Sequence, residues 1–173
     1  MILPDHAIQK LCVEAGMVTP FELELVNPAS LDVRLGDNVL IEIEEQKELH
    51  PLSITSYSKE KPFLLMPDEF ILAQTLETFN MPSNVCGQFA LKSSLARAGF
   101  EHLLAGWIDP GFHGSVLTLE LKNARRLHEL PLWPGMRIGQ IIFSQTTSMP
   151  LKTYAETGRY NKDATVKGCK GLT

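Results

Sequence analysis

Cysteine is scarce in this 173-residue chain, which holds only three. Cys12, Cys86 and Cys169 lie far apart in the sequence, so they predict free thiols in a reducing cytoplasm and not a disulfide framework. No stretch approaches the roughly 18 consecutive apolar residues of a transmembrane helix, so we expect no membrane partner. The first residues, MILPD, include no basic segment followed by an apolar run, so no signal peptide is expected.

Several motifs of familiar enzymes are also missing. The zinc-dependent nucleobase deaminases need His-x-Glu and Pro-Cys-x-x-Cys, and no two cysteines here have that spacing. A Walker A loop, a Gly-x-Gly-x-x-Gly motif and a Gly-x-Ser-x-Gly motif are absent, which argues against P-loop, Rossmann and α/β-hydrolase chemistry. The five histidines are scattered and predict hydrogen-bonded or surface residues, not metal ligands.

What the chain does contain is typical of one globular domain. Hydrophobic residues make up 44% and charged residues 21%. Alternating or apolar runs at 39–44, 70–75 and 136–143, with prolines between runs, predict short strands. A helix is expected to open the chain, with Asp5 as its cap and Gly16 at its end. Many short strands and little helix predict a mainly β barrel or sandwich.

The charge is unevenly distributed. Residues 1–80 hold 14 acids and 5 bases, whereas the remaining residues hold 6 acids and 11 bases, within a net charge of −4. A basic half in an acidic protein fits a small polyanion better than duplex DNA, so no nucleic acid partner is expected. Residues 152–173, basic and glycine-containing, predict a flexible C-terminal segment that closes over an anionic ligand. Solvated surface charge without function remains the alternative.

Residues 91–99 (LKSSLARAG) predict a short helix with an anion site at its start. Ser93 is a suitable N-cap and Gly99 a suitable residue just beyond the helix end. Lys92 and two hydroxyls lie at the expected N-terminus, and Arg97 falls on the same face as Ser93. The alternative is a capped surface turn with ordinary charges.

Residues 105–123 predict a hairpin around the turn Asp109-Pro110-Gly111. In the strand that follows, Leu117, Leu119 and Leu121 share one face, and Glu120 lies on the other. A carboxylate flanked by leucines is partly desolvated, which raises its pKa and suits it to proton transfer. The alternative is an outward-facing glutamate on a half-buried sheet.

Five blocks together resemble the dCTP deaminase family, in that family's order. They are residues 28–36 (PASLDVRLG), 92–97 (KSSLAR), 108–112 (IDPGF), 119–121 (LEL) and 133–140 (WPGMRIGQ). The resemblance implies a fold of the trimeric dUTPase-like type, a distorted β-barrel (β-clip) with a few short helices. It divides the chain into a nucleotide-binding barrel domain at 1–151 and a flexible C-terminal lid at 152–173.

The resemblance also implies roles for individual residues. Glu120 matches the glutamate that activates a water for attack on C4 of cytosine, and Ser93 and Arg97 match residues that hold that water and the base. The remaining matched positions are implied substrate contacts: Lys92, Ser94, Ala105, Asp109, Thr118, Leu119, Gln140, Tyr154, Arg159 and Tyr160.

Three departures from the family pattern bear on these roles. Lys92 replaces a usual arginine, so it offers a point charge in place of a bidentate fork. Asp163 replaces a usual glutamine in the lid, and an acid near a triphosphate is unfavourable unless it binds Mg²⁺ or points away. One extra residue lies between Asp109 and Glu120, so a bulge is needed to restore the direction in which the glutamate faces.

The implied activity is zinc-independent hydrolysis of dCTP to dUTP and ammonia by a cytoplasmic homotrimer with sites at its subunit interfaces. No metal site on the protein is expected; Mg²⁺ is expected to arrive with the triphosphate, and dTTP is the expected inhibitor. Two alternatives stay open: a bifunctional enzyme that releases dUMP and diphosphate, which residues 105–109 resemble, and a non-catalytic nucleotide-binding regulator.

Overall fold

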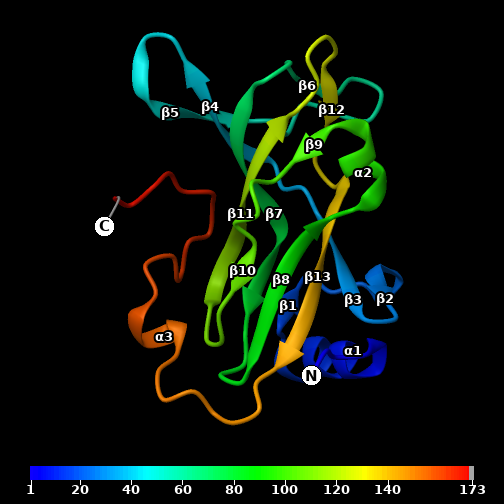
Figure 1. The fold of residues 1–173 in the computed structure, drawn as a ribbon, viewed down its shortest axis with the longest axis vertical. Coiled ribbons are helices and arrows are strands. Elements are labelled where there is room, and N and C mark those ends of the chain that lie inside the picture. The colour runs from blue at the N-terminus through cyan, green and yellow to red at the C-terminus, as the bar shows by residue number, and fades with distance from the viewer. Residues whose placement is uncertain (172–173) are drawn as a thin grey trace.

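The computed structural model describes residues 1–171, which form two antiparallel sheets and a small third one (Figure 1). The helices are α1 (Asp5–Ala15), α2 (Ser93–Ala98) and α3 (Tyr154–Thr157), with a 3-10 turn at Leu23–Leu25. The strands are β1 (Val18–Thr19), β2 (Val26–Asn27), β3 (Ser30–Arg34), β4 (Asn38–Ile43), β5 (Gln46–Ser53), β6 (Phe63–Leu65), β7 (Phe70–Asn80), β8 (Val85–Leu91), β9 (Phe100–Glu101), β10 (Trp107–Ile108), β11 (His113–Asn123), β12 (Leu130–Leu132) and β13 (Arg137–Gln145).

The first sheet has the order β5-β4-β7-β11-β9, with β1 also paired to β7. The second has the order β10-β8-β13-β3-β2, and β12 pairs with β6 in the third. The prediction of a mainly β fold with a few short helices is therefore confirmed, but the sheets of the described residues do not close into a barrel. No helix among residues 1–171 is long and apolar enough to span a membrane.

The local predictions hold with small shifts of boundary. The strands expected at 39–44, 70–75 and 136–143 correspond to β4, the first half of β7, and β13. The opening helix ends at Gly16 in the left-handed conformation, but Pro4 is its N-cap and Asp5 its first helical residue. Asp5 instead accepts a hydrogen bond from the His6 backbone N–H. The core lies between the sheets and contains large buried side chains such as Ile8, Leu31, Phe79 and Phe143.

The predicted hairpin at 109–111 is wrong. The turn joins β10 and β11 directly, but β10 pairs with β8 in the second sheet, whereas β11 pairs with β7 in the first. The turn signal was correct, since Gly111 has φ +84. The chain crosses from one sheet to the other at this turn, and Asp109 therefore lies at the junction of the two sheets.

The bulge expected before Glu120 is present. His113 pairs with Asn80 and Ser115 with Phe79, so β11 carries one residue more than β7 over this interval. Gly114 occupies the extra position with φ +62, a conformation that glycine adopts without steric cost.

A second irregularity lies on β7, where the register shifts between Val116 and Thr118. The buried Thr75 hydroxyl donates to the Glu77 carbonyl at 2.8 Å and accepts from the Leu117 N–H at 2.9 Å, so it replaces the interrupted ladder bonds. Beyond it the regular ladder continues, with Glu120 opposite Leu72. The two irregularities together set the face of β11 on which Glu120 lies.

A buried ion pair joins the two sheets at the β7 bulge. The Glu77 side chain is 1% exposed and accepts from the Arg34 backbone N–H and from Arg34 Nε, at 2.9 and 2.7 Å. Arg34 Nη1 also donates to Glu22 at 2.5 Å. Burial raises the pKa of Glu77, and the hydrogen bonds from Arg34 oppose that rise.

Candidate active site

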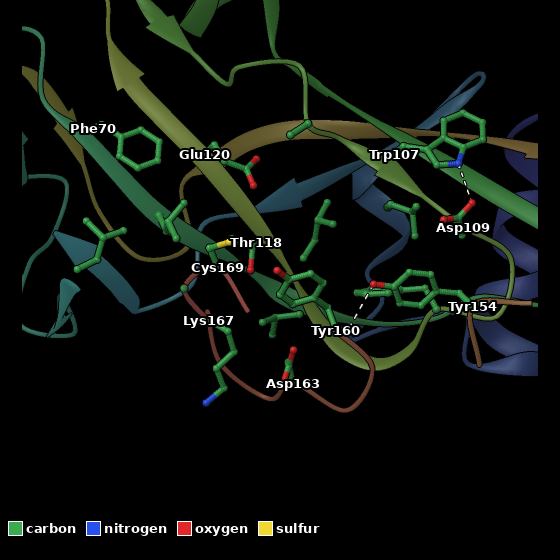
Figure 2. A pocket seen from close by; sticks show the side chains of 18 residues that line it. Phe70, Trp107, Asp109, Thr118, Glu120, Tyr154, Tyr160, Asp163, Lys167 and Cys169 are labelled. Atoms are coloured by element: carbon green, nitrogen blue, oxygen red, sulfur yellow. Dashed lines mark hydrogen bonds between the residues drawn. The ribbon is translucent and has the colours of Figure 1, made fainter. Parts of the chain in front are cut away.

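A cavity of about 500 Å³ lies beside β11, between the two sheets and the C-terminal segment (Figure 2). It contains several side chains expected to bind substrate, and most of its other lining is apolar. The lining residues are Leu49, Phe70, Leu72, Ala105, Trp107, Ile108, Asp109, Phe112, Val116, Leu117, Thr118, Glu120, Tyr154, Tyr160, Asp163, Lys167, Gly168 and Cys169.

Glu120 is half-buried and points into this cavity from β11 (Figure 2). Burial raises the pKa of its carboxyl above the ordinary value. Within residues 1–171 its carboxylate forms no ion pair that would oppose this rise. A half-desolvated carboxylate with a raised pKa in a cleft is suited to general base catalysis.

The other predicted residues of the cavity surround Glu120. Thr118 precedes it by two positions and therefore shares its face of β11. Asp109 accepts a hydrogen bond from Trp107 Nε1 at 2.9 Å, and both residues line the cavity (Figure 2). The Tyr154 hydroxyl accepts from the Tyr160 backbone N–H at 3.2 Å (Figure 2).

The C-terminal segment 152–171 closes one side of the cavity and packs against β11. Ser115 Oγ donates to the Tyr160 carbonyl at 2.8 Å and accepts from the Asp163 N–H at 3.0 Å. The Asp163 carbonyl in turn accepts from the Val116 N–H at 3.1 Å. These bonds extend along the edge of β11 that β9 leaves unpaired, so the segment is attached by main-chain groups.

The Asp163 carboxylate is paired within this segment. Lys170 Nζ lies 2.7 Å from its Oδ2, and the same ammonium lies 4.8 Å from the centre of the Tyr160 ring. The ion pair neutralises the acid that departs from the family pattern.

Ser93, Ser94 and Arg97 lie on α2, exposed, and do not line the cavity of their own chain. Figure 1 shows α2 on the right of the molecule and the C-terminal segment on the left. The helix is present as predicted, with Gly99 at its end, but Lys92 is its N-cap and no side chain caps it. One chain therefore carries the predicted catalytic residues in two separate places.

Lys92 and Gln140 belong to a second polar cluster, on the five-stranded sheet. Lys92 Nζ lies 2.8 Å from both carboxylate oxygens of Asp32, and Ser30 Oγ donates to Gln140 Oε1 at 2.8 Å. Sequence reasoning assigned no role to Ser30 or Asp32, although both stand in the block 28–36. Ser30 and Asp32 are two positions apart and therefore lie on one face of a strand. That spacing, in a block that matches the family, was the signal that could have identified them.

Two further predicted residues lie outside the cavity lining. The Leu119 side chain is 2% exposed and belongs to the core, and the exposed Arg159 donates from Nη1 to the Gly171 carbonyl at 3.2 Å. The cavity also includes side chains that sequence reasoning missed, among them Phe70, Trp107, Lys167 and Cys169. Phe70 and Trp107 stand in segments expected to be ordered, but nothing local indicated which way they face.

No group of three or more His, Cys, Asp or Glu residues suitable for a metal ion occurs among the described residues.

Comparison with known proteins gives one consistent family. The sequence model described as "dCTP deaminase-like" matches residues 2–146. The "dCTP deaminase, dUMP-forming" of Corynebacterium diphtheriae is 37% identical over 159 residues, covering 86% of this chain and 83% of that protein. The protein of that name from Mycobacterium marinum is 40% identical over 171 residues, covering 91% and 87%.

Solved structures agree on the fold. The 2'-deoxycytidine 5'-triphosphate deaminase of Agrobacterium tumefaciens matches with a TM-score of 0.66 at 21% identity, over 82% of this chain and 48% of that one. The dUTPase of Streptococcus mutans matches with a TM-score of 0.51 at 14% identity, over 75% and 92%. The expected dUTPase-like type of fold is confirmed.

Proposed function

Since the chain belongs to the dCTP deaminase-like family, we propose that it hydrolyses the exocyclic amine of dCTP, with Glu120 as the general base. The observation that carries this proposal is the half-buried Glu120 carboxyl in a cavity of about 500 Å³. Burial raises the pKa of this carboxyl. The names of its relatives support dCTP as the substrate.

In the proposed deamination, Glu120 takes a proton from a water as the water oxygen bonds to C4 of cytosine, and the electron pair of the C4–N3 double bond moves to N3, which receives that proton. Glu120 then takes the remaining proton from the oxygen on C4 and passes it to N4. The C4–N4 bond breaks, neutral ammonia leaves, and a uracil with its C4 carbonyl and its N3–H remains. The apolar lining, which includes Phe70 and Leu72, lowers the local dielectric and strengthens the electrostatic effect of fixed donors on the developing charge.

We further propose that Ser93 and Arg97 of a second copy complete this site in a homotrimer. Within one chain both residues are exposed and lie outside the cavity that contains Glu120. A cavity that holds the Glu120 base but not those donors is incomplete for deamination, and a neighbouring copy supplies them if the subunits assemble around a threefold axis. The dUTPase-like fold supports the same assembly.

For the product, the bifunctional alternative is favoured over the release of dUTP. Relatives at 37% and 40% identity carry the name "dUMP-forming", so we propose a second step in which water attacks the α-phosphorus, the bond from that phosphorus to the bridging oxygen of the β-phosphate breaks, and diphosphate leaves while dUMP remains. Asp109 is a second carboxylate in the same cavity and is positioned by the Trp107 N–H. It is the candidate base for this second hydrolysis.

The triphosphate is proposed to arrive as its Mg²⁺ complex and to be bound by the basic C-terminal segment together with Lys92 and Ser94 of the second copy, which stand beside Ser93 at the start of α2. The proposed inhibitor is dTTP. The residues described include no cluster of ligands for an ion of their own, so the phosphate oxygens are its main ligands. Mg²⁺ typically keeps such substrate and water ligands.

Product analysis tests the proposal directly. Incubation with dCTP and Mg²⁺ should yield ammonia, dUMP and diphosphate in equal amounts. Anion-exchange chromatography resolves the nucleotides and diphosphate, and ammonia is measured in a separate assay. Accumulation of dUTP with no diphosphate would mean that the protein is a deaminase that releases dUTP. Tight nucleotide binding without release of ammonia would favour the non-catalytic regulator. A chelator of Mg²⁺ should stop turnover, whereas a zinc-selective chelator should not.

A further inference from the structure

Asp32 lies at the centre of the polar cluster on the five-stranded sheet. Its side chain is only 3% exposed, yet it faces three nitrogen donors. Lys92 Nζ lies 2.8 Å from each carboxylate oxygen, Asn27 Nδ2 donates to Oδ1 at 2.8 Å, and Arg137 Nη1 lies 3.7 Å from Oδ2. The carboxylate thus joins nitrogen donors from three other places in the chain.

Side chains of β3 contact both Lys92 and Gln140, which are two of the expected nucleotide contacts. Asp32 stands opposite Gln140 in the β3–β13 register, and Ser30, two positions earlier on the same face of β3, donates to Gln140 Oε1 at 2.8 Å. Asp32 meanwhile holds Lys92, which lies at the start of α2 beside Ser93 and Ser94.

We propose that Asp32 is a positioning residue that holds Lys92 ready for the triphosphate of the nucleotide, an inference that rests on the proposed function. An ammonium has three N–H groups. Two of them can meet the two carboxylate oxygens of Asp32, and Lys92 Nζ has no third acceptor within residues 1–171, so the third N–H is available to a phosphate oxygen. Because a lysine side chain loses much rotamer freedom when it is held in one geometry, the ion pair removes that entropy cost before the nucleotide binds.

A contribution to folding stability explains the Asp32–Lys92 pair poorly. Burial of a carboxylate costs desolvation free energy that the attraction of an ion pair often does not offset, so such a pair is weak evidence for a stabilising role. Lys92 also remains partly exposed, with a side-chain exposure of 31%, as a group that meets a ligand must.

A positioning role and a purely electrostatic role of Asp32 predict opposite changes in triphosphate affinity when its charge is removed. The negative charge of Asp32 repels a triphosphate, so its removal should tighten binding if only net charge matters. If Asp32 acts by holding Lys92, its removal should weaken binding, and the loss should disappear when Lys92 is already absent. The charge-neutral variant Asn27→Ala loosens Asp32 and separates the two effects.

The experiment measures binding of Mg²⁺·dCTP and of deoxycytidine by equilibrium dialysis, together with kcat and KM for dCTP. Asp32→Asn should weaken dCTP binding about tenfold, as expected for a lost charge-assisted contact, and raise KM while kcat stays within about threefold. Asn27→Ala should weaken dCTP binding about threefold. Neither should change binding of deoxycytidine, which has no phosphate.

A double-mutant cycle with Lys92→Met identifies the route of the effect. Asp32→Asn in the Lys92→Met background should cause no further loss, and the same should hold for Asn27→Ala. The matched control is Asp68→Asn, which removes a carboxylate from the exposed pair Lys122–Asp68, whose N–O distance is 3.4 Å. It should bind dCTP like the wild type.

Tighter or unchanged dCTP binding by Asp32→Asn together with wild-type binding by Asn27→Ala would overturn the inference. So would additive losses in the cycle, equal losses for deoxycytidine, or a wild-type chain that binds no triphosphate. If Asp32→Asn does not fold, the Asn27→Ala arm alone decides. A wild type that binds dCTP with this pattern but releases no ammonia refutes the proposed function and leaves the positioning role supported.

Discussion

The backbone N–H of Val166 donates to Gln74 Oε1 over 2.8 Å, and this buried bond ties the C-terminal segment to β7. The Val166 side chain is itself 5% exposed. Together with the two hydrogen bonds of Ser115, the bond shows that main-chain groups and one apolar side chain anchor the segment. From the sequence we expected the basic charge of the segment to close it over an anionic ligand. The structure adds uncharged contacts that hold the segment without a nucleotide.

Deletion of residues 157–173 should abolish turnover. The deletion opens the cavity on the side lined by Tyr160, Asp163 and Lys167, so water enters and the Glu120 electrostatics weaken. The far-UV circular dichroism spectrum should keep its β character. Tm should fall by a few degrees because the buried Val166, the packing of Tyr160 against the core and the hydrogen bonds of the segment are lost. Full activity of the truncated chain would contradict a lid.

A milder variant of the same test is Ser115→Ala, which removes both hydroxyl hydrogen bonds to the segment but keeps the chain intact. It should increase the rate of proteolytic cleavage within 152–171 about fivefold to a hundredfold, because each of the two lost bonds contributes about 0.5–1.5 kcal/mol. Ser148→Ala, at an exposed position, is the matched control. In both proteins dCTP should protect the segment better than deoxycytidine, and equal protection would argue against closure by the triphosphate.

Glu120→Gln should reduce kcat about 10²–10⁴-fold or more, because the amide cannot accept the proton of the attacking water. Nucleotide binding should change little, since the side chain keeps its size. Stopped-flow or discontinuous ammonia release gives kcat, and equilibrium dialysis gives Kd. A variant that deaminates at the wild-type rate would remove the general base role from Glu120.

The pH dependence follows from the raised pKa of Glu120. The base must be ionised to act, so kcat should fall with acidification at a midpoint above about 4.3, the ordinary glutamate value. A carboxyl whose folded pKa is raised contributes stability that is present below the unfolded pKa and is lost as pH rises through the folded pKa. Glu120→Gln should therefore have a higher Tm than the wild type at pH 7 and an equal one near pH 4.

Calorimetry across this range checks the stability part independently of turnover. A Tm difference between Glu120→Gln and the wild type that is the same at both pH values would show that Glu120 is not desolvated in the folded protein.

Arg34→Met should lower the free energy of unfolding by about 3–5 kcal/mol, because it leaves the buried Glu77 carboxylate without its cation. Urea denaturation followed by tryptophan fluorescence measures the change. Lys122→Met removes the cation of the exposed pair with Asp68 and should cost less than about 1 kcal/mol. Equal losses in the two variants would mean that the Arg34–Glu77 pair is screened by water.

Contacts between neighbours in the chain were predictable from the sequence. Helix α2 and its end at Gly99 follow from propensity and from a glycine that tolerates the left-handed conformation. The half-buried face of β11 with Thr118 and Glu120 follows from the period of two in a strand. The turn at Gly111 was also correctly placed, because these signals depend on interactions within a few residues.

What only the tertiary structure decided depends on residues far apart in the chain. The ladder partners of β10 and β11 put Asp109 between two sheets, and no local pattern encodes the choice of partner. Lys92 and Asp32 are 60 positions apart, and Gln74 and Val166 are 92 apart. The residues next to a side chain in the sequence determine whether it lies on a strand and on which face. The residue that it contacts across the fold is determined by how the sheets pack. Burial and hydrogen bonding must be satisfied across the whole core, so no local segment decides that contact.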